Sequence, residues 1–137
     1  MLKEYKFKYA DDYSLLMNYI NGNLDYSSLD NFEIELNKEV ASRDSSKTML
    51  NLLTKENLNV IGGSADVASS VKTALSHSVS INYNDFSGQS INYGIREFAM
   101  AAVNNGILLH GGLKTYAGSF LVFSDYLKPA VRMASLM

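Results

Sequence analysis

Two kinds of apolar pattern follow each other along the chain, and the change lies near residue 40. Over Tyr5–Tyr9 aromatic residues alternate with lysine, which is the period of a short strand. A helical spacing follows and stops at Asn21-Gly22, so we expect a short helix there through Leu15, Leu16, Tyr19 and Ile20. Residues 23–40 show no clear period and are interpreted as a connecting segment that lies against another part of the protein.

Helical and strand patterns alternate regularly from residue 41 onward. Ser42 is expected to cap a helix over Arg43–Leu53, which buries Met49, Leu50, Leu52 and Leu53. Apolar runs predict three short strands, within residues 58–66, 90–94 and 113–119. We expect the first of these strands to break at Gly62-Gly63.

The remaining segments connect these strands. Residues 67–90 are rich in serine and asparagine and predict a loop with a short helix, and an apolar helix should run over Arg96–His110. A final helix is expected over residues 120–137, with a kink or a restart at Pro129. Helices that alternate with short apolar strands are typical of an α/β fold, a parallel sheet with flanking helices.

Composition narrows the class of protein. The chain has 137 residues, which suits one domain, and 47% hydrophobic residues provide for a packed core. A formal net charge of −2 and no basic run argue against a nucleic-acid partner. The chain has no cysteine, which excludes disulfides and is consistent with a cytoplasmic location. It also has neither a signal-peptide pattern nor 18 consecutive apolar residues, so no membrane association is expected.

Few residues suggest chemistry on their own. The chain lacks a P-loop, a G-x-G-x-x-G fingerprint, H-E-x-x-H and G-x-S-x-G. His77 and His110 are far apart in sequence, so no metal site is expected, and His110 suits the end of a helix. Arg96 and Glu97 form a charged pair where the apolar helix begins; the helix dipole alone would favour a carboxylate there.

Two further candidates each have an ordinary structural interpretation. Asp66 follows a strand and two glycines, where parallel α/β proteins place ligands, but aspartate is also a common turn residue. Phe120, Phe123 and Tyr126 are spaced to form one stripe on a helix. Such a stripe is most often core, although it also suits a flat wall for a planar ring.

Four stretches together resemble one family. They are ASRDSS at residues 41–46, IGGSADVASS at 61–70, INYGIREFAMAAVNNGILLHGG at 91–112 and TYAGSFLVFSDYLKPAVRMASLM at 115–137. In order and near spacing they resemble the pyrimidine-binding domain of transketolase. The resemblance implies the thiamine diphosphate-binding fold, here incomplete. It divides the chain into a connecting segment from a missing preceding domain, residues 1–37, and the N-terminal part of the pyrimidine-binding domain, residues 38–137.

The resemblance also implies roles for single residues. Glu97 matches the catalytic glutamate that contacts a ring nitrogen of the cofactor's aminopyrimidine. Phe123 matches the residue that stacks on that ring, with Phe120 and Tyr126 as its aromatic neighbours, and Asp66 matches an aspartate close to the cofactor. Arg43 and Ser70 match residues that hold the sugar phosphate, whereas His110 lies at a position that varies in the family.

The implied activity belongs to a longer protein. Transketolases transfer a two-carbon ketol unit from a ketose phosphate to an aldose phosphate in the pentose phosphate pathway. They use thiamine diphosphate and Mg2+ at a site between two subunits of a homodimer. The Gly-Asp-Gly motif that binds Mg2+ and the diphosphate does not occur in this sequence. The chain alone is therefore expected to be inactive, to bind the cofactor weakly and to self-associate through uncovered apolar surface.

Two alternatives stay open. A dihydroxyacetone synthase would share nearly every one of these motifs, whereas the GGSAD and YGIREF stretches disfavour a deoxyxylulose-phosphate synthase. A non-catalytic interaction module of the same fold is a hypothesis of another class. The retention of Glu97, Asp66, Arg43 and the aromatic trio argues against this module.

Overall fold

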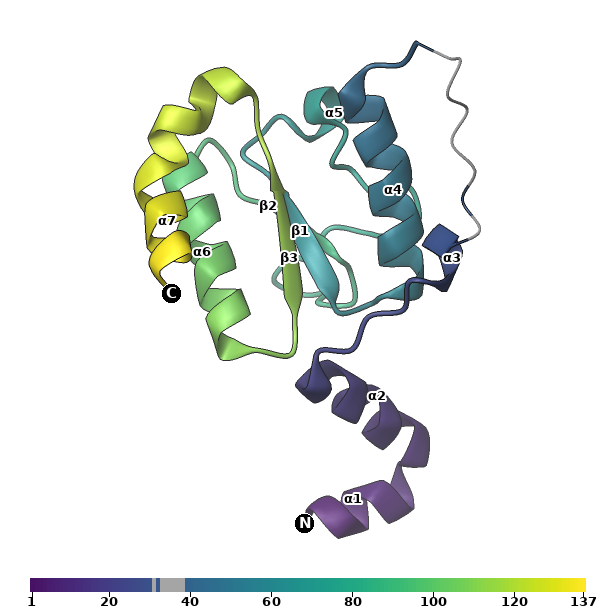
Figure 1. Ribbon diagram of the computed structural model, residues 1–137. Coiled ribbons are helices and arrows are strands. Elements are labelled where there is room, and N and C mark those ends of the chain that lie inside the picture. The colour runs from purple at the N-terminus through teal and green to yellow at the C-terminus, as the bar shows by residue number, and fades with distance from the viewer. Residues whose placement is uncertain (31, 33–38) are drawn as a thin grey trace.

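A parallel three-stranded sheet forms the centre of the molecule (Figure 1). The computed structural model describes residues 1–30, 32 and 39–137. The strands are β1 (Val60–Ser64), β2 (Ser90–Asn92) and β3 (Lys114–Gly118), in the order β2-β1-β3. β1 pairs in parallel with both of its neighbours. The predicted α/β class with a parallel sheet and flanking helices is therefore confirmed.

Helices lie on both sides of this sheet. α4 (Ser42–Glu56) covers one face, while α6 (Glu97–His110) and α7 (Ser124–Leu136) pack together on the other (Figure 1). The short helix α5 (Ala68–Val71) follows β1 directly. This arrangement is expected because parallel strands need crossover connections and helices on both faces. No helix within the described residues is long and apolar enough to cross a membrane.

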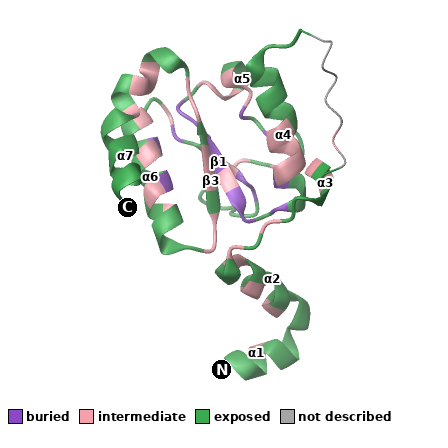
Figure 2. Ribbon diagram, viewed as in Figure 1, coloured by how far each residue is buried: buried purple, intermediate pink, exposed green. Residues whose placement is uncertain are grey.

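The core lies where the sheet meets α6 and α7. Tyr93 and Met100 are buried together with Ala65, and Ile91 and Leu127 pack against them. Figure 2 shows that the buried residues gather on β1 and the segments next to it. The N-terminal helices carry no buried residue.

A buried polar chain crosses this core. The hydroxyl of Tyr93 donates to Oδ1 of Asn104 at 2.6 Å, and Nδ2 of Asn104 donates to the carbonyl of Tyr116 at 3.4 Å. The chain links the segment before α6, the middle of α6 and β3. Because a buried hydroxyl is costly without a partner, these bonds help to fix α6 on the sheet.

The glycine pair of β1 does not break the strand, contrary to the prediction. Gly62 and Gly63 both lie within β1, and both are buried. A side chain on Gly62 would collide with the carbonyl of Tyr116 in β3, and one on Gly63 with the carbonyl of Ile91 in β2. The glycines are therefore needed because the neighbouring strands approach β1 closely.

The N-terminal segment forms helices and not the predicted strand. α1 (Leu2–Lys8) replaces that strand, and the rings of Tyr5 and Tyr9 lie 5.4 Å apart along it. Alternation alone did not indicate a strand here, because a strand also needs a paired neighbour and a face to bury. α2 (Ala10–Asn21) confirms the predicted short helix, and Gly22 ends it in the left-handed conformation with φ 64°.

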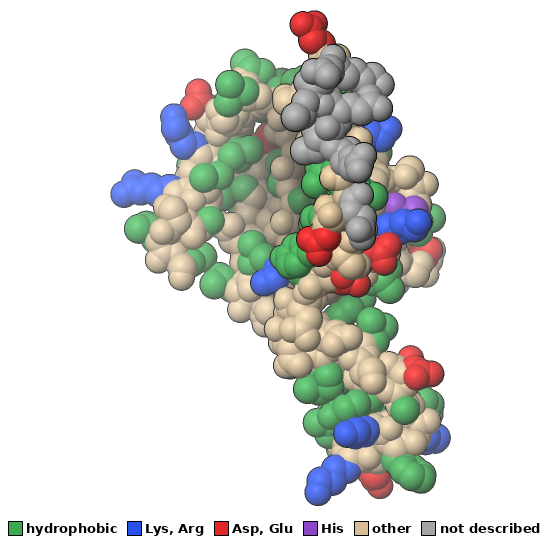
Figure 3. All heavy atoms as spheres, turned by 45° about the vertical axis from the view of Figure 1, so that its right-hand side comes forward, with side chains coloured by type: hydrophobic (Ala, Val, Ile, Leu, Met, Phe, Trp, Pro, Cys, Tyr) green, Lys and Arg blue, Asp and Glu red, His purple; other side chains and the backbone are tan. Residues whose placement is uncertain are grey.

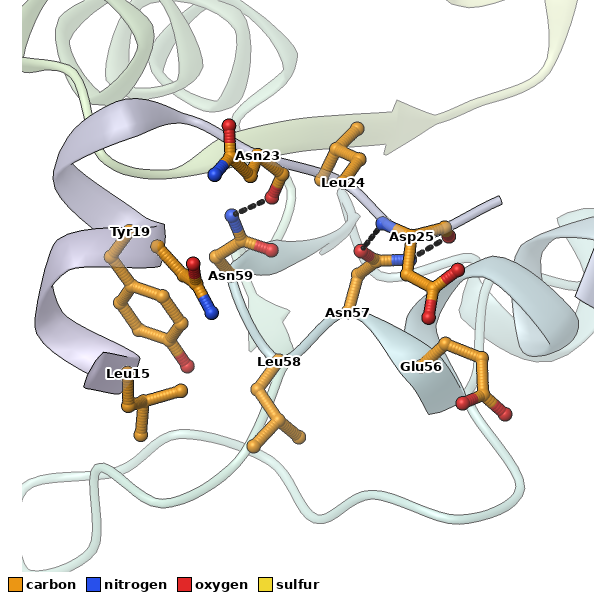
Figure 4. Close-up of a pocket in the computed structure, with 10 residues that line it drawn as sticks. Leu15, Tyr19, Asn23, Leu24, Asp25, Glu56, Asn57, Leu58 and Asn59 are labelled. Atoms are coloured by element: carbon orange, nitrogen blue, oxygen red, sulfur yellow. Dashed lines mark hydrogen bonds between the residues drawn. The ribbon is translucent and has the colours of Figure 1, made fainter. Parts of the chain in front are cut away.

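Side-chain amides attach the following segment to the domain. Asn57 exchanges two hydrogen bonds with the backbone of Asp25, at 2.6 and 2.7 Å, and Asn59 donates to the carbonyl of Asn23 at 3.1 Å (Figure 4). α3 (Ser27–Asp30) comes next. The rest of the predicted connecting segment lies partly at residues 31 and 33–38, outside the described residues.

Helix boundaries differ from the predictions at two places. α4 begins at Ser42 itself, after Ala41 as the N-cap, so Ser42 does not cap the helix. Its predicted apolar face is half-buried, and Thr54 is its fully buried residue. The last helix starts later than predicted, with the 3-10 turn η1 (Leu121–Phe123) before α7. α7 then runs through Pro129 without a restart.

Candidate functional site

The carboxyl ends of the three strands meet at one edge of the sheet. They are Ser64, Asn92 and Gly118, and α5, α6 and η1 follow them in the chain (Figure 1). Arg43 lies at the start of α4, and the other predicted site residues come shortly after these ends. Parallel α/β proteins place their ligands at this edge because loops and helix amino ends converge there. The fold therefore gathers the candidates at one end of the molecule.

One core cluster ties three of these candidates together. Asp66 follows the cluster residue Ala65, and Tyr126 precedes Leu127, which packs on the cluster. Glu97 lies about one helical turn before Met100, the fully buried member of the cluster. Segments that are remote in sequence are thus anchored to the same few buried side chains.

Glu97 is the first residue of α6 and is half-buried. Within the described part of the chain its carboxylate makes no hydrogen bond and no ion pair. The backbone N–H groups of a first helical turn favour a negative charge at this place. The carboxylate of Glu97 is therefore available to form a hydrogen bond with a bound ligand.

Arg96 has a structural task that the sequence did not reveal. Its Nη1 donates to the carbonyl of Tyr93 at 2.9 Å, so the side chain folds back over the loop before α6. Gly94 lies beneath it with φ 65°, and a Cβ there would be 2.7 Å from Nη1. Arg96 therefore braces the loop that positions Glu97.

The three aromatic rings form an accessible cluster. The ring centroids of Phe120 and Phe123 are 6.2 Å apart, and those of Phe123 and Tyr126 are 6.3 Å apart. Phe120 precedes η1 with an extended backbone, so the rings do not share one helix as predicted. Phe120 is 40% exposed and Tyr126 is 65% exposed. The alternative that the stripe belongs to the core is therefore wrong.

A groove of about 540 Å³ lies between the first turns of α4, the short helix α5 and the end of β3. Arg43 and Ser70 both line it, and Phe120 stands at its side. Figure 3 shows the surface hollowed between the two helical layers. The structure thus brings together two residues 27 positions apart in sequence. Glu97, Asp66, Phe123 and Tyr126 do not line this groove.

Asp66 occupies an unusual backbone position. It is exposed and has φ 65°, in the left-handed region that a residue other than glycine seldom adopts. The adjacent Ser64 accepts a hydrogen bond on Oγ from the N–H of Val67 at 3.2 Å, which closes the turn after β1. The turn directs the chain from β1 into α5 and leaves the Asp66 side chain accessible.

A buried tyrosine, Tyr93, and a half-buried one, Tyr116, lie under the site. Burial raises the pKa of Tyr93 to about 12, and the neighbouring Tyr116 contributes to this shift. The pKa of Tyr116 is also raised by burial. Both phenols therefore stay neutral near pH 7 and act as hydrogen-bonding groups. Sequence reasoning assigned no role to either residue.

Two further polar side chains at the groove were also missed. The hydroxyls of Thr73 and Ser119 are buried without a hydrogen-bond partner, and both residues line the groove of Arg43 and Ser70. No sequence signal distinguishes them from the other hydroxyl residues nearby. Within residues 1–30, 32 and 39–137 no three histidine, aspartate or glutamate side chains are placed to hold a metal ion.

The sequence profile of the family described as "Transketolase, pyrimidine binding domain" matches residues 38–137. The chain belongs to this family. A transketolase of Halalkalibacterium halodurans is 50% identical over 103 residues, which are 75% of this chain and 16% of that protein. A transketolase of Staphylococcus epidermidis is 40% identical over 141 residues and matches the whole chain, with 21% of its own length.

Solved transketolases share the fold. The structure of a Pichia stipitis transketolase in complex with sedoheptulose 7-phosphate has a TM-score of 0.87 and 34% identity, and covers 96% of this chain. The transketolase of Campylobacter jejuni has a TM-score of 0.82 and 36% identity over 98% of this chain. The present chain spans 21% and 20% of these two structures. It therefore corresponds to a minor part of the transketolases that it resembles.

Proposed function

We propose that this chain supplies the pyrimidine-binding half of a transketolase active site. The reaction is the thiamine diphosphate-dependent transfer of a two-carbon ketol unit from a ketose phosphate to an aldose phosphate, in the pentose phosphate pathway. One observation carries the proposal. An unpaired, half-buried carboxylate, Glu97, begins a helix at the carboxyl edge of the sheet, in a chain of the transketolase family.

The residues at this edge fit an aminopyrimidine ring. Phe123, flanked by Phe120 and Tyr126, offers a ring face on which a planar heterocycle can stack. Glu97 offers a carboxylate for a ring nitrogen, and Asp66 lies after the neighbouring strand. When bound, thiamine diphosphate would supply the chemistry for breaking and forming carbon–carbon bonds. We propose that Mg2+ and the diphosphate are held by another domain.

Glu97 is proposed to hold the proton that passes to and from the ring nitrogen. Its position suits acid–base work because half-burial limits competition from water, while the start of α6 stabilises the charged form. Arg96 and Gly94 act as positioning residues, since they set the loop from which Glu97 projects. Met100, one turn further along α6, anchors the helix in the core.

The groove of Arg43 and Ser70 is proposed to receive the phosphate end of a sugar phosphate. An arginine guanidinium can donate two parallel hydrogen bonds to a phosphate, and a serine hydroxyl can add a third. The Pichia stipitis relative was solved with a sugar phosphate, sedoheptulose 7-phosphate, which supports this class of substrate. Phe120 lies beside this groove and next to Phe123, so it connects the phosphate end with the ring site.

The organisation of the whole enzyme is also a proposal. Residues 1–37 would connect to a preceding domain, and residues 38–137 would form the first part of the pyrimidine-binding domain. The full-length enzyme would be a homodimer, in which the diphosphate-binding domain of one subunit faces the pyrimidine domain of the other. The chain alone would then lack the groups that anchor the diphosphate, and we expect no turnover from it.

The test is a complementation assay. The purified chain is mixed with a preparation that supplies the missing parts of the same enzyme, thiamine diphosphate and Mg2+, and ketol transfer is measured. Activity should appear in the mixture, be absent from the chain alone, and fall by at least about a hundredfold with Glu97→Ala. The variant Glu56→Ala, at the opposite edge of the sheet, serves as the control and should keep full activity.

One outcome of this assay would favour a different function. An assembled mixture without activity would favour the interaction module of the same fold. A donor-substrate assay on the complete enzyme would separate a transketolase from a dihydroxyacetone synthase.

A further inference from the structure

The groove of Arg43 and Ser70 has residues at its edge, which we call the rim, and residues deeper inside, which we call the floor. Arg43 and Ser70 are exposed residues at its edge. Thr73 is only 9% exposed and lies deeper, with Ser119 beside it at the end of β3. Their hydroxyl oxygens are two of the three buried side-chain atoms without a partner that the described residues contain. Two of these three unpaired groups therefore meet in one groove.

Packing holds Thr73 against the end of β3. A Cβ on Gly118 would collide with Cγ2 of Thr73, so the end of β3 runs directly against this threonine. The hydroxyl of Tyr116 donates to the carbonyl of Thr73 at 3.4 Å and so ties the same loop to β3. The floor is thus a closely packed part of the sheet edge and not a free loop.

Leaving a buried hydroxyl unpaired is unfavourable, so a group that gains a partner only on binding marks a ligand contact. Both residues line the groove, so a ligand that enters it meets their side chains. There a hydroxyl both donates and accepts, which matches the hydroxyl groups of a sugar. A phosphate, by contrast, is met at the rim by Arg43.

We propose that Thr73 and Ser119 bind the sugar hydroxyls next to the phosphate, while Arg43 and Ser70 bind the phosphate itself. This inference rests on the proposed function of the groove and adds two specificity-determining residues to it. The groove then distinguishes a phosphorylated sugar from a bare phosphate. The ligand class is a phosphate monoester of a polyhydroxylated chain.

The experiment is an NMR titration of the whole chain with two probes, ribose 5-phosphate and inorganic phosphate, at constant ionic strength. The wild-type chain should bind ribose 5-phosphate more tightly than inorganic phosphate. Thr73→Val and Ser119→Ala should each weaken binding of ribose 5-phosphate by about threefold to tenfold and leave inorganic phosphate unchanged. Thr73→Ser keeps the hydroxyl and should retain most of the affinity. Arg43→Gln should weaken both probes.

Controls separate folding from binding. Thr48→Val makes the same chemical change on the exposed face of α4, outside the groove, and should leave both affinities unchanged. The dispersion of the amide spectrum shows whether each variant is folded. If Thr73→Val disturbs the fold, the binding of the two probes is compared between the wild type, Ser119→Ala and Thr73→Ser instead.

Each other result is decisive. If Thr73→Val and Ser119→Ala bind ribose 5-phosphate like the wild type while Arg43→Gln does not, the floor hydroxyls are not ligand contacts and the proposed groove stands. If Thr73→Val and Ser119→Ala weaken the binding of ribose 5-phosphate and of inorganic phosphate equally, the proposal that the floor binds sugar hydroxyls and the rim binds the phosphate is also wrong. If Arg43→Gln binds both probes like the wild type, or if the wild type binds neither, the proposed function of the groove is wrong as well.

Discussion

At the residue scale, the backbone around Glu97 depends on one glycine. Gly94 has φ 65°, and the guanidinium of Arg96 covers it closely. The same loop places Glu97 at the start of α6, so strain introduced at Gly94 would reach the proposed catalytic carboxylate. The sequence shows the glycine, but not the positive φ or the hydrogen bond of Arg96 to Tyr93.

Replacing Gly94 by alanine should lower the free energy of unfolding by about 1–2 kcal/mol, because a Cβ is unfavourable at positive φ and would press on Arg96. Urea denaturation measures the change. Gly106→Ala is the matched control: Gly106 lies inside α6 with open space around it, so alanine should stabilise the protein by about 0.5–1 kcal/mol. Equal effects of the two substitutions would contradict the role given to Gly94.

Tyr93 makes the free energy of unfolding depend on pH in the alkaline range. Its pKa is about 12 in the folded protein and near 10 when unfolded. Because the folded-state pKa is raised, the stabilisation is complete below pH 10 and is lost as the pH rises toward 12. We expect the free energy of unfolding to fall by roughly 2 kcal/mol over this interval through Tyr93. Tyr93→Phe should reduce this slope, leaving the smaller contribution of Tyr116; an unchanged slope would refute the assignment.

At the element scale, the correct predictions came from apolar runs that pair with another strand or pack against the sheet. β2, β3 and α6 lie where the pattern placed them, because β2 and β3 both pair with β1 and α6 buries Met100 and Asn104. The failures have tertiary causes. The alternation at Tyr5–Tyr9 finds no strand to pair with and becomes α1, whereas the pair Gly62-Gly63 stays in β1 because its neighbours leave no space for side chains.

For the candidate site too, some features could be predicted from the sequence and others appear only in the structure. The resemblance to transketolase named Glu97, Phe123 and Arg43, and their roles remain predictions. The groove itself, and the unpaired hydroxyls of Thr73 and Ser119, require knowledge of which loops meet at the sheet edge. Nothing in a single sequence indicates that a particular threonine is buried without a partner.

Asn57 makes two of the three side-chain amide hydrogen bonds that attach the segment after α2 to the domain, and Asn59 makes the third. Asn57→Ala removes the acceptor of the Asp25 amide, so hydrogen exchange at Asp25 should become faster by at least about fivefold. Asn51→Ala is the reciprocal control, because Oδ1 of Asn51 accepts from the N–H of Ser76 instead. It should accelerate exchange at Ser76 and not at Asp25. Faster exchange at both amides in either variant would mean general destabilisation and not a local tether.

At the scale of the whole molecule, one surface carries many exposed apolar side chains. They lie along α6, η1 and α7 and include Phe98, Leu109, Leu121, Val122 and Tyr126. Figure 3 shows that hydrophobic side chains also lie at the surface around the hollow. Exposed apolar side chains favour association, and a net charge of only −2 opposes it weakly.

The chain should therefore self-associate, with a sedimentation mass above the 15.1 kDa of one chain that rises with concentration. Leu121→Lys, at a residue 88% exposed, should shift the equilibrium toward the monomer. Leu58→Lys changes an exposed leucine at the other edge of the sheet and should have little effect. A wild-type chain that remains monomeric at all concentrations would contradict this expectation.

The central claim is that Glu97 meets the pyrimidine ring of thiamine diphosphate. Its most direct test is a crystal structure of the chain assembled with the missing parts of the enzyme and the cofactor. We predict a carboxylate oxygen of Glu97 at about 2.6–3.2 Å from a ring nitrogen, with Phe123 stacked on the ring. A bound cofactor whose pyrimidine lies away from Glu97 and Phe123 would contradict the account.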